Sequence, residues 1–311
     1  MQKTVISEIS ISGVGLHSGV YVTLSVSPAP ADHGIVFKRT DIHKDRAYVP
    51  ARWDKVVNTR LCTVVGNAHG VTVQTIEHLM AAFAGCGIDN ALVELNGPEV
   101  PATDGSSAPF VSMIKAAGIE KQNKPRRFIE IVKDVSVTLG DKKAILRKHE
   151  GHNFVTHIDF DHPVIGAQSF EFDGISGSFE NEIAPARTYG FLDDVKALRK
   201  MGLALGGSTD NALVLDHNVI LNEDGLRFPD EFVRHKLLDA MGDLYLAGPI
   251  IGSYESWRGG HELNNAILRE LKAKPDCYRI VQEDFSLEDA RASYLCISRK
   301  KGFPSSSKAV A

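Results

Sequence analysis

The sequence predicts an α+β protein composed of two similar halves, and three observations support this fold class. Residues 3–12 and 20–27 alternate polar and apolar side chains with a period of two, which is typical of half-buried strands. Later segments show the longer apolar period of helices. In each half, several strands are followed by a helix, a strand and a second helix. This shared order suggests that one α+β unit was duplicated, although the halves share little sequence identity.

In the first half, the two alternating segments flank the turn GVGLHSG at residues 13–19. A helix is expected at about 74–86, followed by a strand at about 90–97. The loop PEVPATDG then leads to a second helix that starts near Ser106–Ser107. Pro109 would lie in the first turn of this helix, where its missing N–H costs no hydrogen bond.

The stretch KQNKPRR at residues 121–127 is polar, basic and interrupted by proline, so we place the domain boundary there. We expect an N-terminal α+β domain at residues 1–122 and a C-terminal α+β domain at residues 127–295. The tail GFPSSSKAVA at residues 302–311 is expected to be disordered.

The second half continues the same alternation of strands and helices. Strands are expected at 128–139, 143–148, 153–160 and 249–257. Helices are expected at about 192–201, 230–247 and 261–274. The first of these helices and the glycine-rich GLALGGSTDNA at 202–212 form an insertion near 190–215.

The composition is that of a globular protein with an ordinary core, since 43% of the 311 residues are hydrophobic and 24% are charged. The net charge of −4 lacks the basic excess of nucleic-acid-binding proteins. No apolar run approaches the roughly 20 residues that span a bilayer, and the N-terminus lacks the apolar stretch of a signal peptide. We therefore expect a cytoplasmic protein that binds no nucleic acid.

The four cysteines, Cys62, Cys86, Cys277 and Cys296, are scattered and form no CxxC pair. This spacing argues against a disulfide framework and against a cysteine-rich zinc site. A metal ion in this protein would therefore be held by histidine and carboxylate side chains.

One such set of side chains lies on the helix EFVRHKLLDAMGDLYLAG, which runs from Glu231 to Gly248. His235, Asp239 and Asp243 follow one another at intervals of four residues, so they share a face opposite the apolar face. This stripe is either half of a metal site or a solvated polar surface. Taken alone, a His–Asp pair at this spacing is more often part of a solvated surface than of a metal site.

The helix TIEHLMAAFAG at residues 75–85 differs, because Glu77 and His78 are its only charged or titratable residues. A helix without a polar face is buried on most sides, and charged groups inside a protein are paired or bind metals. The pair is therefore either a metal-binding element or a structural Glu–His pair near the start of a helix.

Taken together, the two helices suggest a zinc site composed of His78, His235 and Asp239. Three protein ligands plus water are typical of catalytic zinc, whereas structural zinc has four protein ligands. Glu77 would act as general base on the water, whose pKa zinc lowers to roughly 7. The protease motif HExxH is absent, so we expect a zinc hydrolase of another type.

Two further residues fit this hypothesis. His261 begins the last helix, where the helix dipole disfavours an imidazolium cation. A carboxylate such as Asp243 would restore that cation, making His261 a general acid or an electrostatic stabiliser, whereas the alternative is a histidine that merely lies at a helix end. Thr188, in ARTYGF, could donate its hydroxyl to an oxyanion.

Two segments imitate binding motifs. HEGHNFVTHIDFDH, at residues 149–162, carries four histidines, but its strand-like alternation divides them between two faces, so we expect a solvated surface. The glycine-rich GLALGGSTDNA lacks the GK[ST] of a phosphate-binding P-loop.

Nine motifs make the sequence resemble one enzyme family. They are SGVGLHSG, LCT, TIEHLMAA, NGPEVPATDGSS, IDFDHP, ARTYGF, GGSTDNA, NEDGLRFPDEFVRHKLLDAMGDL and GGHELNN. In this order, from about residue 2 to residue 290, they resemble the UDP-3-O-acyl-N-acetylglucosamine deacetylases, which act in lipid A biosynthesis in Gram-negative bacteria.

The resemblance implies two similar α/β layered sandwich domains from an internal duplication, with the active site at their interface. It implies Zn²⁺, with Fe²⁺ as the other candidate, held by His78, His235 and Asp239. Glu77 would be the base, His261 the acid or cationic stabiliser with Asp243 as its partner, and Thr188 the oxyanion donor.

The resemblance also implies a set of substrate-binding residues: Asp159, Phe160, Tyr189, Lys236, Arg258 and His17. The apolar Ala204, Leu205 and Val214 would line a passage for the acyl chain. Tyr189 and Arg258 depart from the family pattern, which more often has phenylalanine and lysine there. Both changes keep an aromatic ring or a positive charge.

The expected reaction is zinc-dependent hydrolysis of the N-acetyl group of UDP-3-O-(3-hydroxyacyl)-N-acetylglucosamine, the committed step of lipid A and hence lipopolysaccharide synthesis. The alternatives are a zinc amidohydrolase that acts on another acylated amino sugar, and a catalytically silent lipid- or nucleotide-binding protein. The expected partner is the small amphiphilic nucleotide-sugar alone. We expect a monomer, cytoplasmic or loosely associated with the inner membrane surface.

Overall fold

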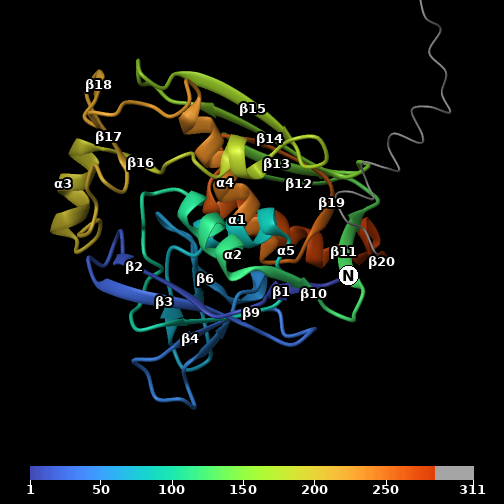
Figure 1. Cartoon of the computed structure of the whole chain (residues 1–311). Coiled ribbons are helices and arrows are strands. Elements are labelled where there is room, and N and C mark those ends of the chain that lie inside the picture. The colour runs from blue at the N-terminus through green and yellow to red at the C-terminus, as the bar shows by residue number, and fades with distance from the viewer. Residues whose placement is uncertain (284–311) are drawn as a thin grey trace, which may run out of the picture.

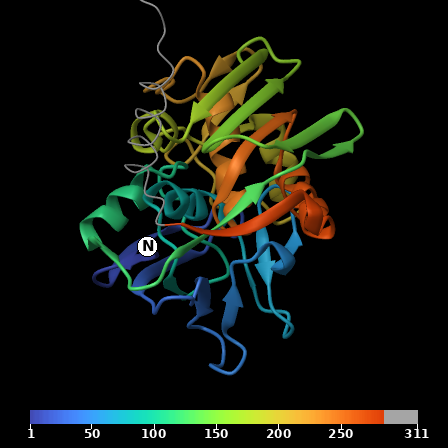
Figure 2. The same cartoon turned by 90° about the vertical axis from the view of Figure 1, so that its right-hand side faces the viewer.

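The computed structural model describes residues 1–283. Two β-sheets form its outer layers, and helices α1 (Glu77–Cys86), α2 (Ala108–Ala117), α4 (Glu231–Tyr245) and α5 (His261–Ala273) lie between them (Figure 1). A view turned by 90° shows the same division into two sheets (Figure 2). The expected α+β class is confirmed. The expected tail at 302–311 and the end of the second domain at 295 lie outside the described residues.

The first sheet has five strands. In spatial order they are β2 (Ile9–Val14), β3 (Tyr21–Pro28), β9 (Ala91–Leu95), β4 (Ile35–Arg39) and β5 (Tyr48–Pro50). The central strand β9 pairs antiparallel with β3 and parallel with β4. Strand β3 alternates buried and exposed residues along its length, because one face of the sheet covers the helices and the other faces solvent.

The second sheet repeats this arrangement with β12 (Val135–Leu139), β13 (Lys142–Arg147), β19 (Ile250–Trp257), β14 (His152–Asp159) and β15 (Ala167–Asp173). Its central strand β19 pairs antiparallel with β13 and parallel with β14. Strand order and direction therefore match those of the first sheet, as duplication of one unit predicts. Strands β11 (Arg126–Ile131) and β20 (Tyr278–Glu283) extend this sheet.

The remaining elements are short. They are β1 (Lys3–Val5), η1 (Trp53–Lys55), β6 (Val56–Asn58), β7 (Val64–Gly66), β8 (Thr72–Val73), β10 (Ile119–Lys121), the π-helix η2 (Phe179–Ile183), β16 (Tyr189–Phe191), α3 (Leu192–Lys200), β17 (Leu213–Asp216), β18 (Val219–Ile220) and η3 (Pro275–Cys277). In Figure 1, α3 and β16–β18 lie together at one side of the molecule. None of the described helices is long and apolar enough to cross a membrane.

The expected strand at 128–139 is wrong as a single element. It is divided into β11 and β12, because the consecutive exposed residues Lys133 and Asp134 interrupt the alternation. The segment 3–12 is likewise divided into β1 and β2. Helix α1 starts later than expected, at Glu77, because Thr75 has a φ of 56° and cannot belong to a right-handed helix.

Helices α1 and α4 cross at very short distance, and a glycine permits this. A Cβ atom at Gly242 would lie 2.0 Å from the carbonyl oxygen of Glu77 and 3.0 Å from the amide nitrogen of Ala81. Only a residue without a side chain allows the backbones to approach so closely. The crossing places the first turn of α1 against the middle of α4.

Candidate active site

The crossing of α1 and α4 brings the three expected metal ligands together. One ligand atom from each of His78, His235 and Asp239 lies within 4.8 Å of the others. The Oδ1 atom of Asp239 is 3.6 Å from Nε2 of His78 and 3.3 Å from Nε2 of His235. All three side chains are buried. The stripe on α4 is therefore no solvated surface, since α1 covers it.

The residues of this cluster fit a metal ion. Among the described residues, the buried Oδ1 of Asp239 has no hydrogen-bond partner, while Lys236 donates to Oδ2 at 2.7 Å. An unpaired buried carboxylate oxygen is costly unless a cation occupies the space in front of it. Burial raises the pKa of Asp239, but His235 and Lys236 outweigh this effect and hold the pKa well below its ordinary value.

His235 is held in the form that binds metals. Its Nδ1 lies 3.0 Å from the carbonyl oxygen of Ala186 and donates a hydrogen bond to it. The lone pair of the ring is therefore on Nε2, the atom that faces Asp239. Burial lowers the pKa of His235 to about 3, so the imidazole is neutral near pH 7. A neutral imidazole with a fixed tautomer is the usual histidine ligand.

A second buried cluster adjoins the first and contains Glu77, Asp243 and His261. Asp243 Oδ2 accepts hydrogen bonds from His261 Nδ1 at 2.9 Å and from Asn264 Nδ2 at 2.8 Å. His261 Nε2 lies 3.8 Å from Glu77 Oε1. The imidazole of His261 therefore lies between two carboxylates.

Their surroundings shift the pKa values of Glu77 and His261 in the directions that acid–base chemistry needs. Burial raises the pKa of Glu77 to about 7, against the opposing charges of His261 and His78. Burial disfavours the cation of His261, but the carboxylates of Asp243 and Glu77 outweigh it and raise the pKa to about 9. Between these values Glu77 is an available base and His261 a cation.

Thr63 connects the two carboxylates of this cluster, and sequence reasoning missed it. Its backbone N–H donates to Glu77 Oε2 at 3.0 Å, and its Oγ1 donates to Asp243 Oδ1 at 2.5 Å. Thr63 belongs to the LCT motif that supported the family resemblance. No local pattern indicates its contacts, because Asp243 is 180 residues away in the chain.

Thr188, the expected oxyanion donor, lies on a segment that is hydrogen-bonded to the loop containing Gly105. Its N–H donates to the carbonyl of Gly105 at 2.8 Å. A Cβ atom at Gly105 would lie 2.2 Å from the carbonyl oxygen of Asn211 and 3.3 Å from the methyl group of Thr188, so glycine is required for this approach. Ser107, in the same loop, donates its hydroxyl to the carbonyl of His78 at 2.6 Å.

Two of the expected substrate-binding residues, Tyr189 and Lys236, lie beside the metal cluster, and Phe160 packs against Tyr189. The ring of Tyr189 is edge-on to the rings of His235 and Phe160, at centroid distances of 6.2 Å and 6.0 Å. Lys236 Nζ lies 5.6 Å from the centroid of Tyr189. The buried hydroxyl of Tyr189 has no hydrogen-bond partner within residues 1–283, and burial raises its pKa to about 12.

The other expected contacts lie toward the surface and in the first half. Arg258 pairs with Asp159 at 2.5 Å, and both side chains are exposed. His17 is buried, and burial lowers the pKa of its imidazole below the ordinary value against the opposing charge of Glu99. Sequence reasoning missed Glu99, which accepts hydrogen bonds from the N–H groups of His17 and Ser18.

The two segments that imitate binding motifs have structural explanations. The histidine-rich segment forms β14, and the described groups able to hold a metal do not include its histidines. The expectation of a solvated surface is wrong for His152, which is half-buried and hydrogen-bonded through its ring to the carbonyl of Ile250. The glycine-rich segment packs on the turn 13–19, where a Cβ at Gly206 would lie 2.2 Å from the carbonyl oxygen of Gly15.

Comparison with known proteins agrees with this geometry. A family profile described as UDP-3-O-acyl N-acetylglycosamine deacetylase matches residues 2–273. The UDP-3-O-acyl-N-acetylglucosamine deacetylase of Myxococcus xanthus (strain DK1622) is 52% identical over 281 residues, which are 90% of this chain and 89% of the relative. The protein of the same name from Haemophilus influenzae (strain 86-028NP) is 48% identical over 283 residues, covering 90% of this chain and 92% of the relative. The chain therefore belongs to the UDP-3-O-acyl-N-acetylglucosamine deacetylase family.

Proposed function

We propose that this protein hydrolyses the N-acetyl group of UDP-3-O-(3-hydroxyacyl)-N-acetylglucosamine, giving acetate and UDP-3-O-acyl-glucosamine, in the committed step of lipid A biosynthesis. Family membership supports the deacetylase reaction and the substrate. The observation that carries the mechanism is the contact between two buried clusters, one suited to a metal and one to proton transfer.

The metal ligands of this proposal are His78, His235 and Asp239, and the metal is Zn²⁺, with Fe²⁺ as the other candidate. Histidine and carboxylate donors suit both ions. When bound, the ion would polarise the acetamide carbonyl and acidify the attacking water. Within residues 1–283, Oδ1 of Asp239 has no hydrogen-bond partner, and Nε2 of His235, which carries the lone pair, faces it; both observations support this ligand set.

Glu77 acts as the general base in this proposal. Its carboxylate takes a proton from the water that attacks the acetamide carbon, and its raised pKa of about 7 matches that task. The hydrogen bond from the Thr63 N–H holds Oε2, which leaves Oε1 to face the reacting water. The side chain is thus oriented before the substrate arrives.

His261 and Thr188 act on the charge that develops in the reaction. Protonated His261, held by Asp243 at 2.9 Å, stabilises the oxyanion of the tetrahedral intermediate, and Thr188 donates its hydroxyl to the same oxygen. His261 or protonated Glu77 then delivers a proton to the departing amine. The raised pKa of His261 supports a cation at neutral pH.

The remaining proposed residues bind the substrate. Tyr189 and Lys236 lie beside the metal cluster, Phe160 packs against Tyr189, and the Asp159–Arg258 pair lies toward the surface, so together they form a candidate site for the nucleotide-sugar. Ala204, Leu205 and Val214 are candidates for the acyl passage. Monomeric state, cytoplasmic location and the domain limits 1–122 and 127–295 stay predictions.

The decisive experiment measures acetate release from UDP-3-O-acyl-N-acetylglucosamine by the purified protein, after chelation and again after addition of one equivalent of zinc. The proposal predicts that activity is lost on chelation and restored by zinc. If the zinc-loaded protein releases no acetate, the proposed function is wrong. Release of acetate from a sugar lacking UDP or the acyl chain at a similar rate would favour an amidohydrolase of another acylated amino sugar.

A further inference from the structure

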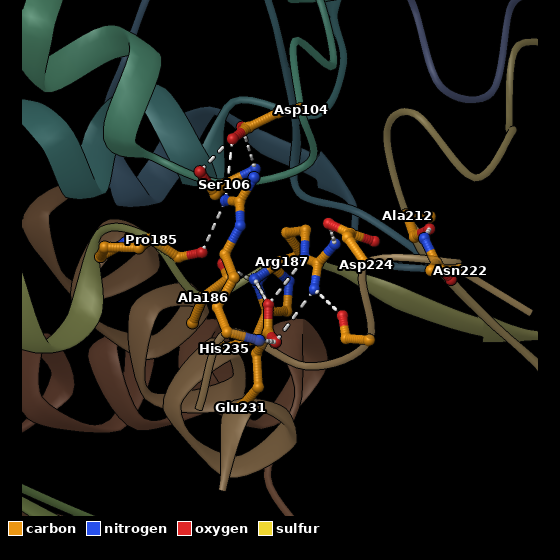
Figure 3. A network of polar contacts seen from close by, with 12 residues as sticks. Asp104, Ser106, Pro185, Ala186, Arg187, Ala212, Asn222, Asp224, Glu231 and His235 are labelled. Atoms are coloured by element: carbon orange, nitrogen blue, oxygen red, sulfur yellow. Dashed lines mark hydrogen bonds and ion pairs between the residues drawn. The ribbon is translucent and has the colours of Figure 1, made fainter. Parts of the chain in front are cut away.

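A buried ion pair lies next to the metal cluster without belonging to it. Arg187 and Glu231 are 3% and 0% exposed. The guanidinium binds the carboxylate through two atoms, Nε to Oε1 at 2.8 Å and Nη2 to Oε2 at 3.3 Å (Figure 3). Within residues 1–283, the hydrogen bonds and ion pairs of the two side chains go to none of the expected substrate-binding residues, so the pair needs another explanation.

Glu231 of this pair hydrogen-bonds to the peptide group between Ala186 and Arg187. Glu231 Oε1 also accepts the backbone N–H of Arg187 at 3.0 Å. The carbonyl of that same peptide, on Ala186, accepts Nδ1–H of His235 at 3.0 Å. Glu231 and His235 are four residues apart on α4, so they reach the two sides of this peptide from consecutive turns.

A peptide is planar and trans, so fixing its N–H also fixes the direction of its carbonyl. Glu231 thereby sets the position of the oxygen that holds Nδ1 of His235. Such partners of a histidine ligand decide both its tautomer and its ring orientation. The charge pair is needed because Glu231 is fully buried and would otherwise be an uncompensated anion.

The Glu231 carboxylate is also connected to the first half of the chain, through Arg227. Its Oε2 accepts the N–H of Arg227 at 2.6 Å, and the guanidinium of Arg227 reaches Asp104 at 2.8 Å and the carbonyl of Pro185 at 2.9 Å. Residues 184–188 are thus held from two sides, by α4 and by the loop that carries Asp104. The segment has little freedom to move away from His235.

We infer that Arg187 and Glu231 are positioning residues that orient the metal ligand His235 through the Ala186–Arg187 peptide. This inference rests on the proposed metal site. It predicts that Glu231→Gln weakens zinc binding about 10- to 100-fold. With zinc at saturation, kcat falls while KM changes little, because neither side chain is among the proposed substrate-binding residues.

The test compares Glu231→Gln with Asp89→Asn. Asp89 is a matched control, since its carboxylate also accepts a backbone N–H, from Lys3, and pairs with an arginine, Arg126, but it lies beyond the C-terminal end of α1. Zinc affinity of each apo-protein is measured by competition with a chromogenic chelator. Thermal unfolding of each apo-protein reports general destabilisation, and the absorption spectrum of the Co²⁺-loaded protein reports the ligand geometry.

We expect weak zinc binding and an altered Co²⁺ spectrum in Glu231→Gln, against near-normal values in Asp89→Asn. Wild-type affinity in Glu231→Gln, or equal losses in both variants, overturns the inference. If the wild-type protein itself binds no zinc, the proposed metal site has failed instead, so the two failures are distinguishable. Should Glu231→Gln not fold, Arg187→Lys and its control Arg126→Lys provide the same comparison.

Discussion

Gly242 of α4 lies directly against the carbonyl of Glu77 in α1, so that a single added carbon would come within 2.0 Å of this oxygen. This contact determines how close the two helices are, and therefore whether His78 reaches His235 and Asp239. The backbone contact and the candidate chemistry occupy the same turn of α1, since Glu77 and His78 are its first two residues.

Gly242→Ala is expected to destabilise the protein by about 1–3 kcal/mol, because the new methyl group forces two backbones apart. It should also weaken metal binding, since the separation moves His78 away from α4. Chemical denaturation and zinc titration measure these effects. Gly190→Ala, where the nearest atom to the new Cβ would be 3.9 Å away, should leave both quantities nearly unchanged. Normal stability in Gly242→Ala would refute the close crossing.

His78→Ala is expected to abolish tight zinc binding, because two ligands cannot replace three in a site of this kind. Metal content after dialysis measures the effect. His157→Ala, in the histidine-rich strand β14, serves as a control that should keep one equivalent of zinc. A stoichiometric metal in His78→Ala would remove His78 from the ligand set.

Glu77→Gln should retain zinc and lose about 10²- to 10⁴-fold in kcat, which is the usual contribution of a general base. The amide has nearly the same size as the carboxylate, so the helix crossing is preserved. Single-turnover measurement of acetate release, together with metal analysis, separates the two effects. Near-normal turnover by the zinc-loaded variant would rule out Glu77 as the base.

The rate is expected to depend on pH as a bell-shaped curve. Glu77 must be deprotonated, so kcat/KM falls as pH drops through about 7; His261 must be protonated, so kcat/KM falls as pH rises through about 9. A bound cation favours the deprotonated form of both groups and shifts both limbs to lower pH. Asp243→Asn removes the carboxylate that raises the pKa of His261, so its alkaline limb should lie at lower pH than that of the wild type. An unmoved alkaline limb would exclude His261 as the group it reports.

Thr63→Val is expected to lower kcat and to cost about 1–3 kcal/mol of stability, because Oδ1 of Asp243 loses its buried donor. Thr63→Ser keeps the hydroxyl and should behave like the wild type. The comparison is made by measuring kcat and the free energy of unfolding of both variants. If valine and serine have equal effects, the hydroxyl does not support Asp243.

The sequence by itself was sufficient to predict much of this protein. Strand and helix periods predicted the α+β class, and the repeated order of elements predicted two similar halves. Spacing by four residues was enough to predict that His235, Asp239 and Asp243 share one face of a helix. The motifs predicted the family, which the comparisons confirm.

Only the tertiary structure decided whether that face is exposed to solvent or buried. His235 and Asp239 are buried because α1 crosses α4 at Gly242, and this depends on contacts between residues more than 150 positions apart in the chain. Thr63, Glu99 and the Arg187–Glu231 pair have no local signature either, because each makes a hydrogen bond to a residue 44 to 180 positions away in the chain. The periodicity of a sequence shows which side chains share a face of one helix or strand. It does not show which helices and strands pack together, because that depends on contacts between residues far apart in the chain.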